Sequence, residues 1–107
     1  MFGDFSKKIQ EAQAKAEEVK QRLSMIEVKG TAGEGRVEVI MTGNRELKDI
    51  RLGVDPKELE KEELEDLLSM AVRDAINQAN SVNEAEMGAL ARDAMPNIPG
   101  LGKMFGK

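Results

Sequence analysis

Three glycines stand close together in the stretch VKGTAGEGRVEV, at Gly30, Gly33 and Gly35, and such a cluster could cradle a phosphate group. Phosphate-binding loops of the Walker and dinucleotide-binding types open a helix, whose N-terminus and backbone N–H groups meet the anion. Here Gly35 is followed by Arg36 and then by alternating apolar and polar residues, a pattern typical of a strand. The glycines therefore indicate a reversal between two strands, where a positive φ is needed, and not a nucleotide site.

Side chains that commonly catalyse reactions are scarce. The 107 residues include neither His nor Cys, which excludes an imidazole base, a thiolate nucleophile, disulfides and the usual zinc ligands. The acidic stretch KELEKEELED, residues 57–66, could hold a metal ion or an acid–base pair. Its carboxylates fall opposite a leucine stripe and near a helix start, where the helix dipole favours acids, so we interpret them as a solvated face. We predict no enzymatic activity, no cofactor and no metal site.

A line of cations is the remaining candidate site. In the heptad register of the first predicted helix, Lys8, Lys15 and Arg22 share the g position, about 10 Å apart, and such a row could track phosphates. Glu11 and Glu18 stand four residues before Lys15 and Arg22, which is the favoured order for intrahelical ion pairs. Charge alone favours the ion pairs, and the net charge of −4 is that of a poor nucleic-acid binder. Both interpretations stay open at this point.

The elements that carry these residues follow from hydrophobic periodicity. Residues 5–26 have apolar side chains alternately four and three apart without Gly or Pro, which predicts a helix with a heptad seam, capped by Asp4 or Ser6. The period then changes to two around residues 26–29, 37–42 and 49–54, which predicts three short strands in an antiparallel meander. Between the second and third strands, Gly43-Asn44 suits a hairpin turn with positive φ.

A second helix follows the meander. Asp55 and Pro56 suit the N-cap and first position of a helix, and a break near Glu60 or Lys61 would separate a short turn from a long helix that ends near Arg92. The Pro/Gly-rich residues 94–107 are expected to form a flexible tail, which leaves residues 1–93 as one domain. No stretch has the ~20 apolar residues of a membrane span, so we expect a cytoplasmic protein.

The lengths of these elements predict a homodimer. The strands make a sheet only ~20 Å long, whereas the second helix would extend ~45–50 Å. The three aromatic residues all stand near the termini, so the core of one subunit is thin. We therefore expect the apolar stripes to be covered by a second, two-fold related copy. The predicted interface residues share an apolar strand or helix face: Val37, Val39, Met41, Ile50, Leu52, Leu68, Val72 and Ile76.

The chain resembles the YbaB/EbfC family of nucleoid-associated proteins over nearly its whole length. The resemblance includes the opening MFG, the helix IQEAQAKAEEVKQRL, the block GTAGEGRVEVIMTGNRELKDIRL, the stretch VDPKELEKEELEDLLSMAVRDAINQAN and the tail MPNIPGLGKMFG. The middle block is the most specific, because Gly33, Gly35, Val37, Val39 and Gly43 stand at the family's spacing. The resemblance implies an α+β subunit of order α-β-β-β-α and a tweezer-like homodimer. It also implies fairly non-specific binding of duplex DNA in the bacterial nucleoid.

Two functions from different classes follow. The first is a nucleoid-associated homodimer that binds duplex DNA through its phosphate backbone and so affects nucleoid organisation or gene expression. The second is a protein-interaction clamp that binds a partner protein and not DNA, which the paired charges and the acidic second helix favour. Neither involves a membrane or a small-molecule substrate. For the first function, helix geometry predicts these DNA-binding residues: Lys8, Lys15 and Arg22, then Lys7, Lys20, Arg73 and Arg92.

Overall fold

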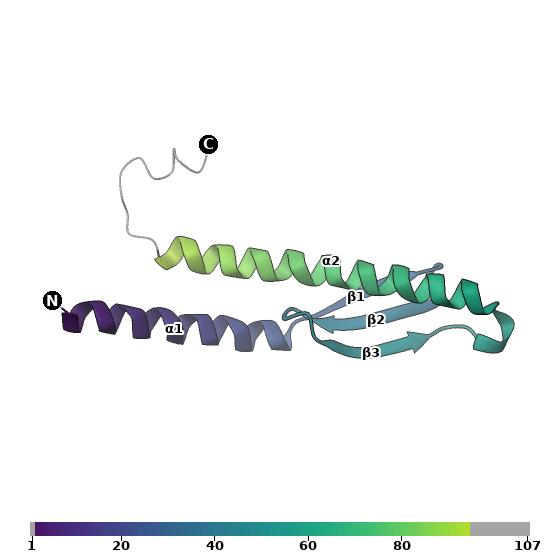
Figure 1. Ribbon diagram of the computed structural model, residues 1–107, viewed down its shortest axis with the longest axis horizontal. Coiled ribbons are helices and arrows are strands. Elements are labelled where there is room, and N and C mark those ends of the chain that lie inside the picture. The colour runs from purple at the N-terminus through teal and green to yellow at the C-terminus, as the bar shows by residue number, and fades with distance from the viewer. Residues whose placement is uncertain (1, 95–107) are drawn as a thin grey trace, which may run out of the picture.

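The computed structural model describes residues 2–94 and has the predicted order of helix, three antiparallel strands and long helix. The strands form one meander in the order β1-β2-β3. Helix α2 crosses one face of the sheet and then runs antiparallel to α1, which projects from the same end of the sheet (Figure 1). Except for Ala94, the predicted flexible tail lies outside the described residues. The elements are α1 (Phe2–Met25), β1 (Glu27–Ala32), β2 (Val37–Thr42), β3 (Leu47–Leu52), η1 (Pro56–Glu58) and α2 (Lys61–Ala94).

The helix starts are partly as predicted. Asp55 caps the one-turn 3-10 helix η1, where its carboxylate accepts a hydrogen bond from the Lys57 N–H at 2.9 Å, and α2 begins separately at Lys61. The prediction that Asp4 or Ser6 caps α1 was wrong, because the helix already begins at Phe2. Asp4 instead lies in the first turn, where its negative charge is favoured by the helix dipole.

The glycine-rich connection is a strand reversal, as the sequence predicted. Residues 33–36 join β1 to β2, and Ala32 pairs with Val37 across the loop. Gly33 and Gly35 have φ values of 62° and 89°, in the left-handed region where a glycine avoids a steric cost. Because a strand and not a helix follows, this loop presents no helix N-terminus to a phosphate.

The second hairpin differs from the prediction. The positive φ falls on Arg45 (67°) and not on Gly43 or Asn44. Gly43 is required for a different reason: a Cβ there would lie 2.9 Å from the carbonyl oxygen of Leu23 near the end of α1. The Gly43 N–H donates to that same oxygen at 3.0 Å, so the β2–β3 hairpin caps the C-terminus of α1 and sets the direction in which the helix leaves the sheet.

The core lies between α2 and the first two strands. Three alanines of α2, Ala71, Ala75 and Ala79, are fully buried and let the helix backbone approach β1. At Gly30 a Cβ would lie only 2.2 Å from the Ala71 carbonyl oxygen and 2.3 Å from the Ala75 nitrogen. Val37 and Val39 of β2 fill the remaining space under α2. The helix therefore packs directly on β1 and β2, and β3 remains beyond its flank.

Candidate nucleic-acid interface

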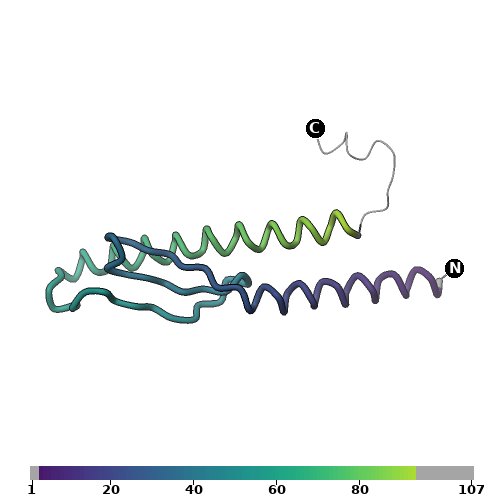
Figure 2. The backbone as a smooth tube through the Cα atoms, turned by 180° about the vertical axis from the view of Figure 1, so that it is seen from behind, coloured from purple at the N-terminus to yellow at the C-terminus, as the bar shows by residue number. Residues whose placement is uncertain are grey.

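The two helices form an arm that extends beyond the sheet. The subunit is elongated, with dimensions of 67 × 31 × 17 Å, and the N-terminal part of α1 projects beyond the described end of α2 (Figures 1 and 2). Val19 and Leu23 of α1 are buried where α2 packs against it. Further out, Ile9 and Phe5 are 43% and 66% exposed. Among the described residues, α2 thus covers the α1 seam only in its C-terminal half.

The cations at the g positions of α1 have different surroundings. Lys8 and Lys15 are exposed and have no ion-pair partner among residues 2–94. Arg22 is also exposed, but its guanidinium lies 2.9 Å from the Glu86 carboxylate of α2. The intrahelical pairs expected from Glu11 and Glu18 are not among the ion pairs of the described chain. Lys8 and Lys15 are therefore available to an anionic ligand, and Arg22 is already neutralised.

The other predicted cations do not form one surface. Lys7 and Lys20 are exposed on other sides of α1, at heptad positions f and e, away from the g line. Arg92 is exposed on α2 next to Asp93, which lines a cleft between the helices together with Lys15, so it lies at the same level of the arm. Arg73 stands 19 residues earlier on α2, about 28 Å away along the helix axis. The structure thus groups most of the predicted cations on the arm and separates Arg73 from them.

The cleft between the two arm helices carries both signs of charge. Lys15 and Arg22 contribute cations, and Glu18, Glu86 and Asp93 contribute acids. A duplex backbone would be repelled by the acids on the inner side of this cleft. Lys8 does not line this cleft, whereas Lys15 does, so Lys8 is the more favourably placed of the two lysines for phosphates.

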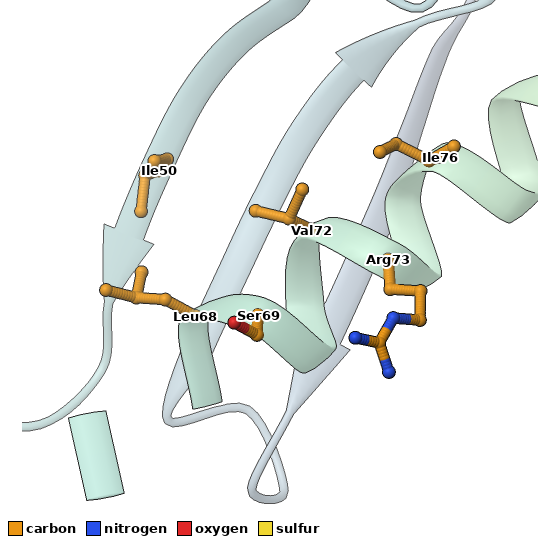
Figure 3. Close-up of a pocket in the computed structure, with 6 residues that line it drawn as sticks. All are labelled: Ile50, Leu68, Ser69, Val72, Arg73 and Ile76. Carbon is orange, nitrogen blue, oxygen red and sulfur yellow. The ribbon is translucent and has the colours of Figure 1, made fainter. Parts of the chain in front are cut away.

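A second surface, an apolar groove, lies beside β3. Ile50 pairs with Val39 across the sheet and so faces the side that α2 covers, yet it is 43% exposed. Figure 3 shows Ile50 above Leu68 and Val72 on the flank of α2, with Arg73 directed away from these apolar side chains. We call this surface the β3 groove; it is lined by Ile50, Leu68, Ser69, Val72, Arg73 and Ile76.

The predicted interface residues divide between the core and the β3 groove. Val37, Val39 and Met41 are buried beneath α2 in the subunit's own core, so they have almost no surface left to contact a second copy. Strand alternation identified the inner face of the sheet correctly but could not show which strands the helix covers. Five of the predicted interface residues remain accessible at or beside the groove: Ile50, Leu52, Leu68, Val72 and Ile76.

The two edges of the sheet differ in how their backbone groups are covered. At the β1 edge, the Thr31 N–H donates to the Asp74 carboxylate at 3.0 Å, and the Gln78 amide donates to the Lys29 carbonyl at 2.7 Å. These side chains of α2 satisfy strand groups that another strand would otherwise use. No equivalent cover lies on β3 within the described part of the chain, where Leu47 is 56% exposed. Sequence reasoning missed Asp74 and Gln78, because their partners stand more than 40 residues away in the chain.

The sheet face opposite α2 is charged and internally paired. Lys48 lies 2.6 Å from Glu27, and its hydrogen bond and positive charge lower the pKa of that carboxyl group below the usual value. Similar pairs join Lys29 to Glu38 and Arg51 to Asp49. Exposed pairs of this kind contribute little stability and keep the face solvated. The acidic residues at the start of α2 are also exposed, in agreement with a solvated helix face.

None of the helices in residues 2–94 is both long and apolar enough to cross a membrane. The same residues contain no group of three carboxylates placed to hold a metal ion together.

Comparison with known proteins gives a consistent result. A nucleoid-associated protein of Flavobacterium johnsoniae is 39% identical over 99 residues, covering 92% of each chain. One of Dictyoglomus thermophilum is 43% identical over 98 residues, covering 89% of this chain and 88% of the relative. An uncharacterized protein of Helicobacter pylori has a similar fold, with a TM-score of 0.66 at 20% identity over 87% of this chain and 95% of the other. The model of the YbaB/EbfC DNA-binding family matches residues 1–95, and the chain belongs to this family.

Proposed function

We propose that this protein is a nucleoid-associated homodimer that binds duplex DNA through its phosphate backbone, with little sequence specificity. The observation that carries the proposal is that Lys8 and Lys15, on the projecting helix of a DNA-binding family member, are exposed and have no ion-pair partner among residues 2–94. Lysine side chains on a helix surface suit phosphate oxygens, which position a protein on DNA without reading its sequence. The relatives that are named nucleoid-associated proteins support a location of this activity in the nucleoid.

Salt dependence tests the phosphate contacts. If each subunit of a dimer presents Lys8 and Lys15, about four phosphates are neutralised, and the logarithm of the association constant should fall with a slope of about −3.6 against the logarithm of salt concentration. The affinity for duplex DNA is then expected to fall about 100-fold between roughly 50 and 200 mM salt. Fluorescence anisotropy with two unrelated duplexes of equal length measures the slope and the specificity together. A slope near zero, or strong preference for one duplex, would contradict the proposal.

The dimer is proposed to form through the β3 groove and the open β3 edge. The β1 edge is closed by Asp74 and Gln78, so sheet extension is favourable only at β3. Two copies related by a two-fold axis beside β3 would cover each other's grooves, and both arms would then project from a shared sheet. This arrangement buries the apolar side chains that one subunit leaves exposed.

The proposed dimer predicts that charged side chains in the β3 groove prevent association of the two subunits. Replacing Ile50 and Ile76 together by lysine is expected to convert a species of twice the 11.8 kDa subunit mass into single subunits, because two cations per copy would be buried against apolar surface. Light scattering at micromolar concentration measures the mass. Met70→Lys is the matched control, since Met70 is exposed on α2 but does not line the groove. A wild-type chain that already has the mass of one subunit would refute the dimer.

A protein-interaction clamp is the second candidate. It is favoured by the cleft between the arm helices, where the Arg22–Glu86 pair and Asp93 leave mixed charge unsuited to DNA. Affinity capture from a lysate, with and without nuclease, separates the two functions. Co-purifying proteins that survive nuclease treatment would support the clamp, and nucleic acid that disappears would support DNA binding.

A further inference from the structure

The N-terminal half of the α1 seam is an apolar surface without a cover among residues 2–94. Phe5, Ile9 and Ala12 continue the stripe that α2 buries at Val19 and Leu23, but all three are exposed. A helical segment of about 14 residues is marginal in water unless one face is packed. A surface of this kind therefore needs an occupant that supplies apolar side chains.

The position at which α2 ceases to cover the α1 seam points to a candidate occupant for the exposed part. Asp93 at the end of α2 lines the same cleft as Lys15 of α1, so the described chain ends opposite the middle of α1. Because α2 runs antiparallel to α1, the axis of α2 at its described end points along α1 toward the uncovered seam (Figures 1 and 2). From the level of Lys15, Phe5 is about 15 Å further along the helix. The 13 residues after Ala94 can span about 40 Å in an extended conformation, which is more than enough.

The sequence of this segment, MPNIPGLGKMFGK, suits such a surface. Pro96 and Pro99 disfavour a continued helix, and Met95, Ile98 and Leu101 recur at every third residue, followed by Met104. In an extended polyproline II conformation, which has three residues per turn, these four side chains share one face. Phe105, next to Met104, is one of only three aromatic residues in the protein. Five large apolar residues in thirteen are more than a purely solvated linker requires.

We propose that residues 95–107 dock along the exposed seam of α1 in the same chain, with Ile98, Leu101 and the following apolar side chains against Ala12, Ile9 and Phe5. The segment would continue the packing that α2 provides up to Ala94 and would hold the outer part of the arm as a helix. It would do so on the seam face, which leaves Lys8 and Lys15 exposed beside it. The C-terminal segment would thus be a structural part of the arm, a role that does not depend on DNA binding.

Disulfide trapping tests this proposal in the full chain, because the natural protein has no cysteine. One variant carries Ala12→Cys on the seam together with Gly102→Cys beside Leu101. The matched control carries Ala14→Cys with the same Gly102→Cys, since Ala14 is equally exposed but two residues off the seam. Under mild oxidation the Ala12 variant is expected to close an intrachain disulfide about tenfold faster than the control, at a rate independent of protein concentration. Equal rates in the two variants would overturn the proposal.

The disulfide products also show whether a different occupant covers the α1 seam. A disulfide-linked pair of subunits, formed faster at higher concentration, would assign the seam to a second copy and overturn the proposal. Hydrogen exchange supplies a measurement without cysteines: replacing Ile98, Leu101 and Phe105 together by serine should speed exchange of the amides in residues 5–14 about tenfold. The control is Asn97→Ser with Lys103→Ser, which should leave exchange unchanged. Equal exchange in the wild type and the triple variant would also overturn the proposal.

Discussion

Replacing Gly30 by alanine is expected to destabilise the protein by about 3 kcal/mol or more, although the change adds a single methyl group. The new Cβ would lie 2.2 Å from the Ala71 carbonyl oxygen and 2.3 Å from the Ala75 nitrogen. Both are backbone atoms of α2, so no side-chain rotation can relieve the overlap. The helix must move away from β1, and the buried contacts of Ala71, Ala75 and Ala79 are then lost. Urea unfolding followed by circular dichroism measures the loss as a lower midpoint.

The same substitution at Gly88 is the matched control. Gly88 lies within α2, and a Cβ there would meet no heavy atom of the described residues within 4 Å apart from the adjacent turns of its own helix. Alanine is favoured over glycine in a helix by about 1 kcal/mol, so Gly88→Ala should raise the midpoint. The same glycine-to-alanine substitution is thus expected to lower the unfolding midpoint at Gly30 and to raise it at Gly88. If Gly30→Ala left the midpoint unchanged, the close packing of α2 on β1 would be wrong.

Gly30 also shows where sequence reasoning reaches its limit. From the pattern alone it belonged with Gly33 and Gly35 as a turn residue, and two of the three have the expected positive φ. Gly30 instead pairs with Val39 within the sheet, and its small size matters because of residues about 40 positions later. Period-two alternation predicted all three strands, since it depends only on neighbouring residues. A helix backbone that packs on a strand leaves no such local signal.

The same distinction, between features set by neighbouring residues and contacts between distant ones, applies to the candidate site. Helix periodicity was sufficient to place Lys8 and Lys15 on one exposed line of α1. It could not show that Arg22 has a partner, because Glu86 stands 64 residues away and on another helix. The expected pairs with Glu11 and Glu18 were inferred from favourable spacing, but exposed intrahelical pairs are weak, and Arg22 pairs across the helices instead. The position of residues within one helix can thus be predicted from the sequence. Contacts between separate helices and strands cannot, because they depend on the fold.

Charge reversal of the two g-position lysines of α1 is expected to have the largest effect on DNA binding. Lys8→Glu together with Lys15→Glu should lower the affinity for duplex DNA by about 100-fold or more at low salt, because cations that neutralise phosphates become acids that repel them. Each lost phosphate contact should reduce the salt slope by about 1, so the slope of a dimer should approach zero. The loss should be similar for unrelated duplexes. Fluorescence anisotropy over a range of salt concentrations measures both quantities.

A control with equal charge separates a local contact from the overall field of the protein. Lys57→Glu with Lys61→Glu makes the same change in net charge, but these exposed lysines lie in η1 and at the start of α2, at the opposite end of the 67 Å subunit. Charges that far from the arm are screened at physiological ionic strength, where the Debye length is about 8 Å. The control should therefore bind DNA within about threefold of the wild type. If both variants lose affinity equally, net charge and not the α1 line governs binding; if neither does, DNA contacts another surface.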